Sequence, residues 1–172
     1  MNIFKISEYN IMYTLDKVYT FEYNRGVKGV LNMVSVNATD VRKNWSTYLD
    51  NVRNKPVFIK RTHDFSALMD IKYLKLALSY VPITYSKVTD KDGSIVISSN
   101  DMDIVSTGKD EQEALLNFTS DLVEYAQEFY DEFEFWSSAP NRAKHIPMIL
   151  KILTADNSQE VEDMLVCQNG QN

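Results

Sequence analysis

A one-sided apolar stripe limits the folds open to this chain more than any other sequence feature. Six large apolar residues recur three or four positions apart, at Leu115, Phe118, Leu122, Tyr125, Phe129 and Phe133. This spacing places them on one face of an α-helix of about five turns. Thr107-Gly-Lys-Asp110 provides a capping signal just before the stripe. The sequence therefore predicts a long amphipathic helix that begins near Asp110.

Runs of β-forming residues precede this helix. Residues 83–88 and 94–98 flank a turn that ends in Asp92-Gly93, a dipeptide typical of tight reversals. A third, shorter run lies at residues 104–105. We expect these segments to form a small antiparallel sheet.

Two further helices are predicted after the long one. A loop around residues 136–140 comes first, and apolar spacing then indicates a helix from Ile146 to Leu153 with Pro147 in its first turn. A last short helix is expected around Val161, Met164 and Leu165.

Residues 34–54 begin a separate pattern. Residues 34–36 have the composition of a short strand, and Asn37 can cap a helix, with Asp40 in the position that completes a capping box. The predicted helix ends near Asn54. Its apolar stripe consists of Val41, Trp45, Tyr48 and Val52, with Leu49 beside it.

A hairpin and a helix complete this first unit. Residues 57–61 and 65–69 are β-rich runs around the turn Thr62-His-Asp64. Asp70 can cap a helix that Pro82 ends. The predicted order is βαββα followed by βββααα, which is an α+β chain with its main boundary at Pro82.

Residues 1–32 show no sustained periodicity, although residues 19–23 have the composition of a short strand. The Lys-Gly-Val sequence at residues 28–30 can be encoded by a purine-rich stretch that resembles a ribosome-binding site upstream of Met33. We therefore treat residues 1–32 as an extension of uncertain role, with Met33 as an alternative start.

The net charge of −6 is unevenly distributed. Residues 33–80 contain 8 Lys or Arg and 4 Asp or Glu, whereas residues 81–172 contain 6 Lys or Arg and 17 Asp or Glu. This asymmetry suggests that the first part contacts a polyanion and the second a basic partner. Two solvated surfaces of unlike sign are the simpler alternative.

The composition argues against several classes of protein. The single cysteine, Cys167, permits no internal disulfide, and with His63 and His145 it supplies too few ligands for a structural zinc cluster. No apolar window approaches the roughly 18 residues of a membrane span, and charged residues interrupt the first segment where a signal peptide would be apolar. We expect a cytoplasmic protein without metal, cofactor or membrane contact.

The first unit resembles the prevent-host-death (Phd/YefM) antitoxin family over residues 33–80. The resemblance depends on Val34-Ser-Val-Asn-Ala-Thr-Asp-Val-Arg-Lys-Asn-Trp-Ser-Thr-Tyr-Leu-Asp50, followed by Pro56-Val-Phe-Ile-Lys-Arg61 and Ala67-Leu-Met-Asp70. It implies a dimer that binds operator DNA, with a C-terminal part that blocks a toxin, often a basic RelE-like ribonuclease. The turn at residues 62–65 departs from the Gly or Asn turn of many members.

Residues 83–130 look like the HicB-type antitoxin fold, a small sheet followed by a helix. The matching segments are Tyr85-Ser-Lys-Val-Thr-Asp-Lys-Asp-Gly-Ser-Ile-Val96 and Gly108-Lys-Asp-Glu-Gln-Glu-Ala114. Where that family has an aromatic-Pro-Asp segment, this chain has Ser99-Asn-Asp101 without proline. This resemblance is used for the fold alone.

DNA binding requires cations where phosphates pass. Arg42 and Lys43 fall in the first turns of the predicted helix, and the resemblance implies that Arg42 faces DNA while Lys60 and Arg61 contact phosphates from the hairpin. Plain solvated surface is the alternative for these cations. Trp45, Tyr48 and Leu49 are assigned to core and dimer packing, the usual role of aromatics on one helical face.

The acidic part offers a candidate surface for a basic toxin around the end of the long helix. Carboxylates there would speed capture, and aromatic side chains would supply binding energy. A solvated helix end with aromatics in its own core is the alternative. The candidate toxin-binding residues are Glu128, Phe129, Asp131, Glu132, Phe133, Glu134 and Trp136.

The sequence as a whole predicts a non-enzymatic antitoxin of a type II toxin–antitoxin pair. It would comprise the extension at 1–32, a dimerisation and DNA-binding domain at 33–81 and an acidic domain at 82–172 that masks a RelE/ParE-like toxin. As a homodimer it would also repress its own operon. Two alternatives stay open: an adaptor or inhibitor without DNA binding, and a metal-dependent nuclease using Asp101 and Asp103 with Glu111 or Glu113.

Overall fold

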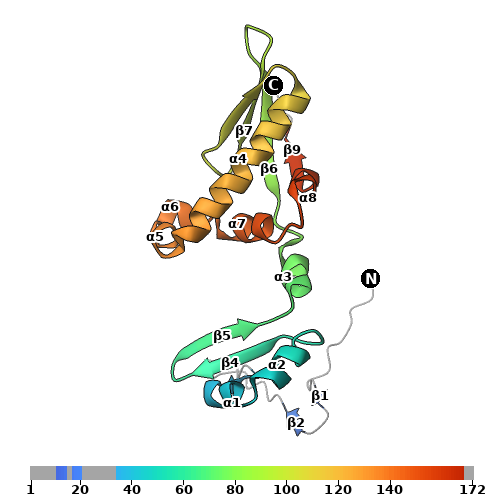
Figure 1. Cartoon of the computed structure of the whole chain (residues 1–172), viewed down its shortest axis with the longest axis vertical. Coiled ribbons are helices and arrows are strands. Elements are labelled where there is room, and N and C mark those ends of the chain that lie inside the picture. The colour runs from blue at the N-terminus through green and yellow to red at the C-terminus, as the bar shows by residue number, and fades with distance from the viewer. Residues whose placement is uncertain (1–10, 15–16, 21–33, 169–172) are drawn as a thin grey trace, which may run out of the picture.

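The structure, a computed structural model, describes residues 11–14, 17–20 and 34–168. Figure 1 shows two parts, one built around strands β3 to β5 and the other around strands β6 to β9, with helix α3 between them. Helices and small sheets coexist in both parts, which confirms the α+β prediction.

An antiparallel pair of strands precedes the first part. It consists of β1 (Ile11–Thr14) and β2 (Lys17–Thr20). The strand predicted at residues 19–23 overlaps β2 at its end, and residues 21–23 lie outside the described residues. The alternative start at Met33 also lies outside them.

The first part is a three-stranded sheet with two short helices. In the sheet, β4 lies between β3 and β5, parallel to β3 and antiparallel to β5. The predicted order of elements is present, except that one helix became two. The elements are β3 (Val36–Asn37), α1 (Ala38–Lys43), α2 (Trp45–Asn51), β4 (Val57–Arg61), β5 (Asp64–Leu68) and α3 (Ile71–Leu78).

The helix predicted from residue 37 to 54 is broken at Asn44, whose backbone angles of φ −120° and ψ 34° are not helical. Asn37 caps α1 as expected by accepting from the Thr39 amide. Asp40 does not complete a capping box. Its carboxylate instead accepts from the Asn44 side-chain amide and the Tyr48 hydroxyl, and the latter bond raises the pKa of Tyr48. Asp40 therefore joins the two helices across the break.

The hairpin of β4 and β5 has a two-residue loop. Arg61 pairs with Asp64, which leaves Thr62 and His63 to connect the strands. Thr62 has a φ of +52°. A β-branched residue is strained there, and this is the turn where the sequence departs from the Gly or Asn of the family pattern.

The second part is a four-stranded sheet in the order β8-β7-β6-β9. The predicted antiparallel sheet is confirmed for β6, β7 and β8, and a fourth strand that was not predicted, β9, pairs with β6 in parallel. Leu165, expected in a helix, begins β9, where backbone pairing with Ile83 replaces helical bonds. The strands are β6 (Ile83–Thr89), β7 (Ile95–Ser99), β8 (Val105–Gly108) and β9 (Leu165–Cys167).

Helix α4 (Glu111–Asp131) lies across one face of this sheet, as Figure 1 shows. The predicted stripe is its buried face, with Phe118, Leu122 and Phe129 at 0% exposure. Asp110 caps the helix by accepting from the Glu113 amide at 2.9 Å. The sequence prediction for this element is confirmed, except that Phe133, the last residue of the predicted stripe, lies beyond the end of the helix.

Four short helices follow α4. Pro147 lies in the first turn of the third, as predicted. The prediction of a loop around residues 136–140 is wrong, because Pro140 begins a helix there. In the first turn of a helix the missing N–H of proline costs nothing. The helices are α5 (Phe133–Ser138), α6 (Pro140–Ala143), α7 (Ile146–Leu153) and α8 (Ser158–Asp163).

Replacing Thr62 by asparagine should stabilise the protein by about 0.5–1 kcal/mol, because asparagine tolerates a positive φ. The measurement is the free energy of unfolding in urea. Thr89→Asn at the exposed end of β6 is the control, and there asparagine should give no gain because it disfavours strands. If Thr62→Asn left the free energy of unfolding unchanged or lowered it, the turn would not be strained.

Candidate functional site

The four basic residues predicted to contact DNA are all exposed: Arg42, Lys43, Lys60 and Arg61. The β3–β4 register places Lys60 beside Asn37, the residue that caps α1, and α1 itself packs against β4. None of the four forms an ion pair within the described part of the chain. The structure therefore brings these cations into one small unit without local neutralisation.

Lys60 and Arg61 do not form a side-by-side pair, however. Successive residues of a strand point to opposite faces of the sheet. Arg61 is on the face of β4 that contains buried Val57, whereas Lys60 shares the other face with Phe65, whose ring centroid lies 5.6 Å from the Lys60 Nζ. The hairpin end therefore presents one cation on each of its two faces.

The residues assigned to core and dimer packing are largely exposed in the single chain. Trp45 is 50% and Leu49 46% exposed, while Tyr48 is half-buried with its hydroxyl on Asp40. Val41 and Val52 of the same stripe are buried. The core assignment is therefore wrong for Trp45 and Leu49, because a helix this short and broken at Asn44 turns only part of its stripe inward.

The candidate toxin-binding residues divide into two groups. Phe129 is fully buried, and it packs on the rings of Phe133 and Trp136, at centroid distances of 5.7 Å and 6.4 Å. Phe129 thus belongs to the core and is excluded as a contact residue, and the other two rings are half-buried. The four carboxylates are exposed and form no ion pair among the described residues: Glu128, Asp131, Glu132 and Glu134.

Two exposed aromatic residues next to these carboxylates were missing from the predicted set. Phe135 is 67% and Tyr130 57% exposed. A shallow depression of about 800 Å³ is lined by residues 131–135 and Ser138. Sequence spacing could have identified Tyr130, which falls outside the apolar stripe of α4, but Phe135 depends on the turn between α4 and α5.

A polar cluster of Tyr125, His145, Arg142 and Asp103 lies close to this surface. His145 is 2% exposed, and its Nδ1 lies 2.8 Å from the hydroxyl of Tyr125. Arg142 donates to the same hydroxyl and pairs with Asp103 at 3.2 Å. Burial lowers the pKa of His145, and the charges of Arg142 and Lys144 lower it further.

The carboxylates proposed for a metal-dependent nuclease have other partners. Asp101 accepts from the Thr84 hydroxyl at 2.9 Å, and Asp103 pairs with Arg142. Glu111 pairs with Lys87 and Glu113 with Lys109. Within the described residues, no group of three or more His, Cys, Asp or Glu could hold a metal ion.

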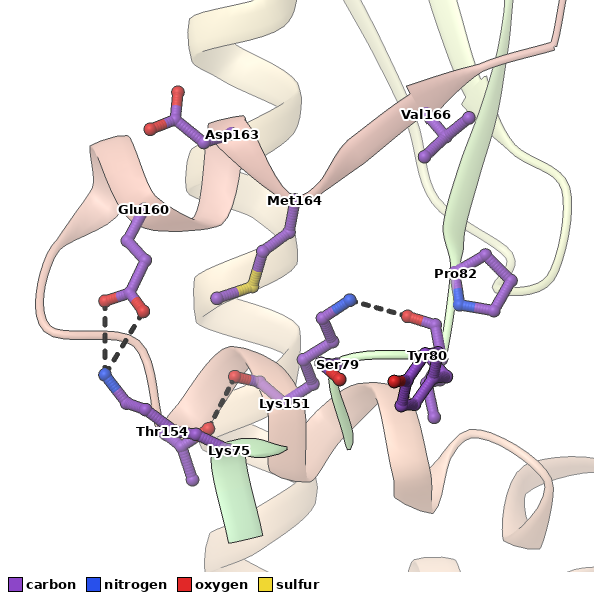
Figure 2. Close-up of a pocket in the computed structure, with 11 residues that line it drawn as sticks. Lys75, Ser79, Tyr80, Pro82, Lys151, Thr154, Glu160, Asp163, Met164 and Val166 are labelled. Atoms are coloured by element: carbon purple, nitrogen blue, oxygen red, sulfur yellow. Dashed lines mark hydrogen bonds and ion pairs between the residues drawn. The ribbon is translucent and has the colours of Figure 1, made fainter. Parts of the chain in front are cut away.

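A separate cavity of about 500 Å³ lies where the two parts meet, and Figure 2 shows its walls. Lys151 of α7 is 9% exposed and donates to the Val81 carbonyl at 2.6 Å. Lys75 of α3 pairs with Asp156 at 3.0 Å and Glu160 at 3.1 Å. Sequence reasoning did not find this cavity, because α3, α7, α8 and β9 each contribute only a few residues.

The lowered pKa of the buried His145 side chain predicts a pH dependence of stability. Because this pKa is lower in the folded than in the unfolded chain, the unfolded chain binds a proton more readily as the pH falls below about 6.5. The free energy of unfolding should therefore decrease from pH 7 to pH 5. His145→Gln should abolish most of this decrease in urea titrations, and the control His63→Gln, in the exposed hairpin loop, should retain it.

No helix of the described residues is long and apolar enough to cross a membrane. Among curated proteins, none matches the chain significantly. Residues 33–167 match a family profile described as a PHD-like antitoxin of RelE/RelB toxin–antitoxin systems. The chain is also similar to a crystal structure from Syntrophomonas wolfei subsp. wolfei, described as the antitoxin part of a proposed toxin/antitoxin system. The identity is 34% over 80% of this chain and 100% of that chain, with a TM-score of 0.76. The chain therefore belongs to this family of antitoxins of RelE/RelB toxin–antitoxin systems.

Proposed function

We propose that this antitoxin neutralises a RelE/ParE-like toxin by direct binding and, as a homodimer, represses its own operon by binding operator DNA. Residues 33–81 form the dimerisation and DNA-binding domain, of the Phd/YefM type, and residues 82–172 form the toxin-binding domain. The arrangement of a small sheet followed by α4 also supports the HicB-like resemblance of residues 83–130. The observation that carries the proposal is the separation of charge: the cations Arg42, Lys43, Lys60 and Arg61 of one unit and the carboxylates at the end of α4 in the other form no ion pair with any residue that the structure describes.

The end of the β4–β5 hairpin is the DNA-contacting element. A two-stranded ribbon fits the major groove of B-DNA, and phosphates border that groove on both sides. Lys60 and Arg61 lie on opposite faces of the ribbon end, so each can reach a different phosphate backbone. Arg42 and Lys43 add two cations from α1, the helix that follows β3, and β3 is the strand that pairs with β4.

Dimerisation would cover the apolar surface that the single chain leaves exposed. Besides Trp45 and Leu49, Phe58 is 37% and Phe65 51% exposed in this small unit. A two-fold dimer presents the four cations twice, once for each half-site of an operator, although the net charge of the whole chain is unfavourable for DNA binding. Pairing of two copies therefore supports both stability and operator recognition.

The end of α4 together with α5 is the toxin-binding surface. Exposed carboxylates attract a basic protein from a distance, and Phe135 and Tyr130 provide area for tight packing. Phe133 and Trp136 hold the surface in place from the core side. Binding here masks the toxin by occlusion, which requires no chemistry by the antitoxin.

The DNA-binding proposal is tested with a duplex from the chain's own promoter. Arg42→Ala, Lys60→Ala and Arg61→Ala should each weaken binding several-fold and reduce the slope of log affinity against log salt by about 1. Fluorescence anisotropy over a salt series measures both quantities. Lys91→Ala, in the exposed turn after β6, is the control and should change neither. Failure of the unaltered protein to bind its promoter would favour the adaptor alternative.

Toxin binding is tested by reversing charge on the proposed surface. Glu132→Lys combined with Glu134→Lys should slow association with a basic toxin by roughly tenfold at low salt, because electrostatic steering is lost. Phe135→Ala should instead speed dissociation. Surface plasmon resonance separates the two rates, and Asp90→Lys in the β6–β7 turn is the charge control. Unchanged rates in all variants would exclude this surface.

A further inference from the structure

Two lysines and two carboxylates line the junction cavity, but their charges are not equally available to an occupant. Lys75 pairs with Glu160 at 3.1 Å, and the Glu160 carboxylate also accepts from the Asp156 amide, so the charge of Glu160 is neutralised within the wall. Figure 2 shows the Asp163 side chain pointing away from the cavity. Of these four lining groups, Lys151 therefore remains as a charge that faces the cavity without a counter-charge on its wall.

The Lys151 ammonium is buried with most of its hydrogen-bonding capacity unused. The residue is 9% exposed, and Figure 2 shows its side chain running from α7 to the linker between α3 and β6 (residues 79–82), where its Nζ donates to the Val81 carbonyl at 2.6 Å. An ammonium group has three N–H donors, and this bond uses one of them. Burial lowers the pKa of Lys151 because the charged form loses its hydration. An anion beside Nζ would recover part of that loss.

The two hydroxyls of the wall leave this role to Lys151. Ser79 donates to the Leu76 carbonyl at 2.7 Å, and Thr154 donates to the Lys151 carbonyl at 2.9 Å, so the hydrogens of both hydroxyls are engaged. A phosphate group has three acceptor oxygens and close to two negative charges at neutral pH, which calls for several donors. A single ammonium matches a single negative charge better, and this favours a carboxylate.

The remaining wall of the cavity is largely apolar. Pro82 and Met164 line it, as do Tyr80 and Val166, which are 88% and 50% exposed. An occupant would therefore cover apolar surface that now faces water. The volume of about 500 Å³ is typical of small-molecule sites, in which a few polar groups orient a ligand within apolar walls. The cavity thus combines one cationic donor with an apolar surface that includes an aromatic ring.

We propose that the junction cavity binds a small organic monocarboxylate with an aromatic body. The carboxylate accepts from Lys151, and the aromatic body packs against Tyr80, Pro82 and Met164. This site goes beyond the proposed function, because it requires neither toxin nor DNA. The ligand contacts both the linker, through Tyr80 and Pro82, and strand β9, through Val166.

The test titrates the full chain with benzoate and follows chemical-shift changes in NMR spectra. Benzoate should bind saturably with a Kd of roughly 1 mM, as expected for so small a ligand. Benzamide has the same ring without the charge, and it should bind at least about tenfold more weakly because it lacks the charge-assisted bond. Lys151→Met removes the ammonium and should weaken benzoate about tenfold without affecting benzamide. Lys91→Met, in the exposed turn after β6, is the control and should bind benzoate normally.

A second pair of variants leaves the buried lysine in place. Val166→Glu and Val166→Gln introduce side chains of the same shape that differ in charge at an exposed position of the wall. Val166→Glu should bind benzoate several-fold more weakly than Val166→Gln, because like charges repel, and benzamide should not distinguish the two. Thermal unfolding without ligand establishes that each variant is folded.

The outcomes decide between this site and general attraction of anions. Loss of benzoate binding in Lys151→Met, together with the charge effect at Val166, supports the site. Equal benzoate affinity of Lys151→Met and the unaltered chain overturns it, as does the absence of saturable binding below about 20 mM. Displacement of benzoate by an equal concentration of inorganic phosphate would also overturn it, because the aromatic body would then contribute nothing. The proposed function is unaffected by any of these results, since its own tests use toxin and operator.

Discussion

The packing of α4 on the four-stranded sheet is the contact on which the rest of the molecule depends. Phe118, Leu122 and Phe129 are completely buried between this helix and its neighbours, as are Ile83 and Ile97 of the sheet. Burying each such side chain contributes about 1.5–3 kcal/mol. The same helix fixes both ends of the unit, since α7 and α8 pack on it and α5 continues from its end. A rigid support of this kind allows the acidic surface to be presented without a partner.

The first unit has a much smaller core. Val41, Val52 and Val57 are its buried apolar side chains, apart from Leu78 of α3, whereas two larger side chains of the same unit, Trp45 and Phe65, are half exposed. Units of about 50 residues bury a smaller share of their surface and are marginally stable, so association can contribute much of their stability. The exposed rings are the surface that the proposed dimer would cover, so that the proposed dimerisation would stabilise this unit as well as pair its cations for DNA.

The sequence predicted those elements whose signals are local. Asn37, Asp70 and Asp110 cap helices as expected, and the α4 stripe is buried as its spacing indicates. Features that depend on distant pairing were missed. Strand β9 exists because it pairs with β6, about 80 residues away, and the junction cavity requires four separate elements. Side chains alternate between the two faces of a strand, so the sequence already places Lys60 and Arg61 on opposite faces. The prediction nevertheless gave both residues the same role, contact with phosphates.

In the proposed function, the junction between the units is the path by which toxin binding and DNA binding would influence each other. Two lysines tie the linker to the second unit, Lys75 through Asp156 and Glu160 and Lys151 through the Val81 carbonyl. Lys75 belongs to helix α3, and α3 follows β5 of the hairpin directly in the chain. If a toxin bound to the second unit shifts these contacts, the orientation of the hairpin becomes dependent on toxin. Thermodynamic linkage makes such an effect reciprocal, and operator DNA would then alter toxin affinity by the same factor.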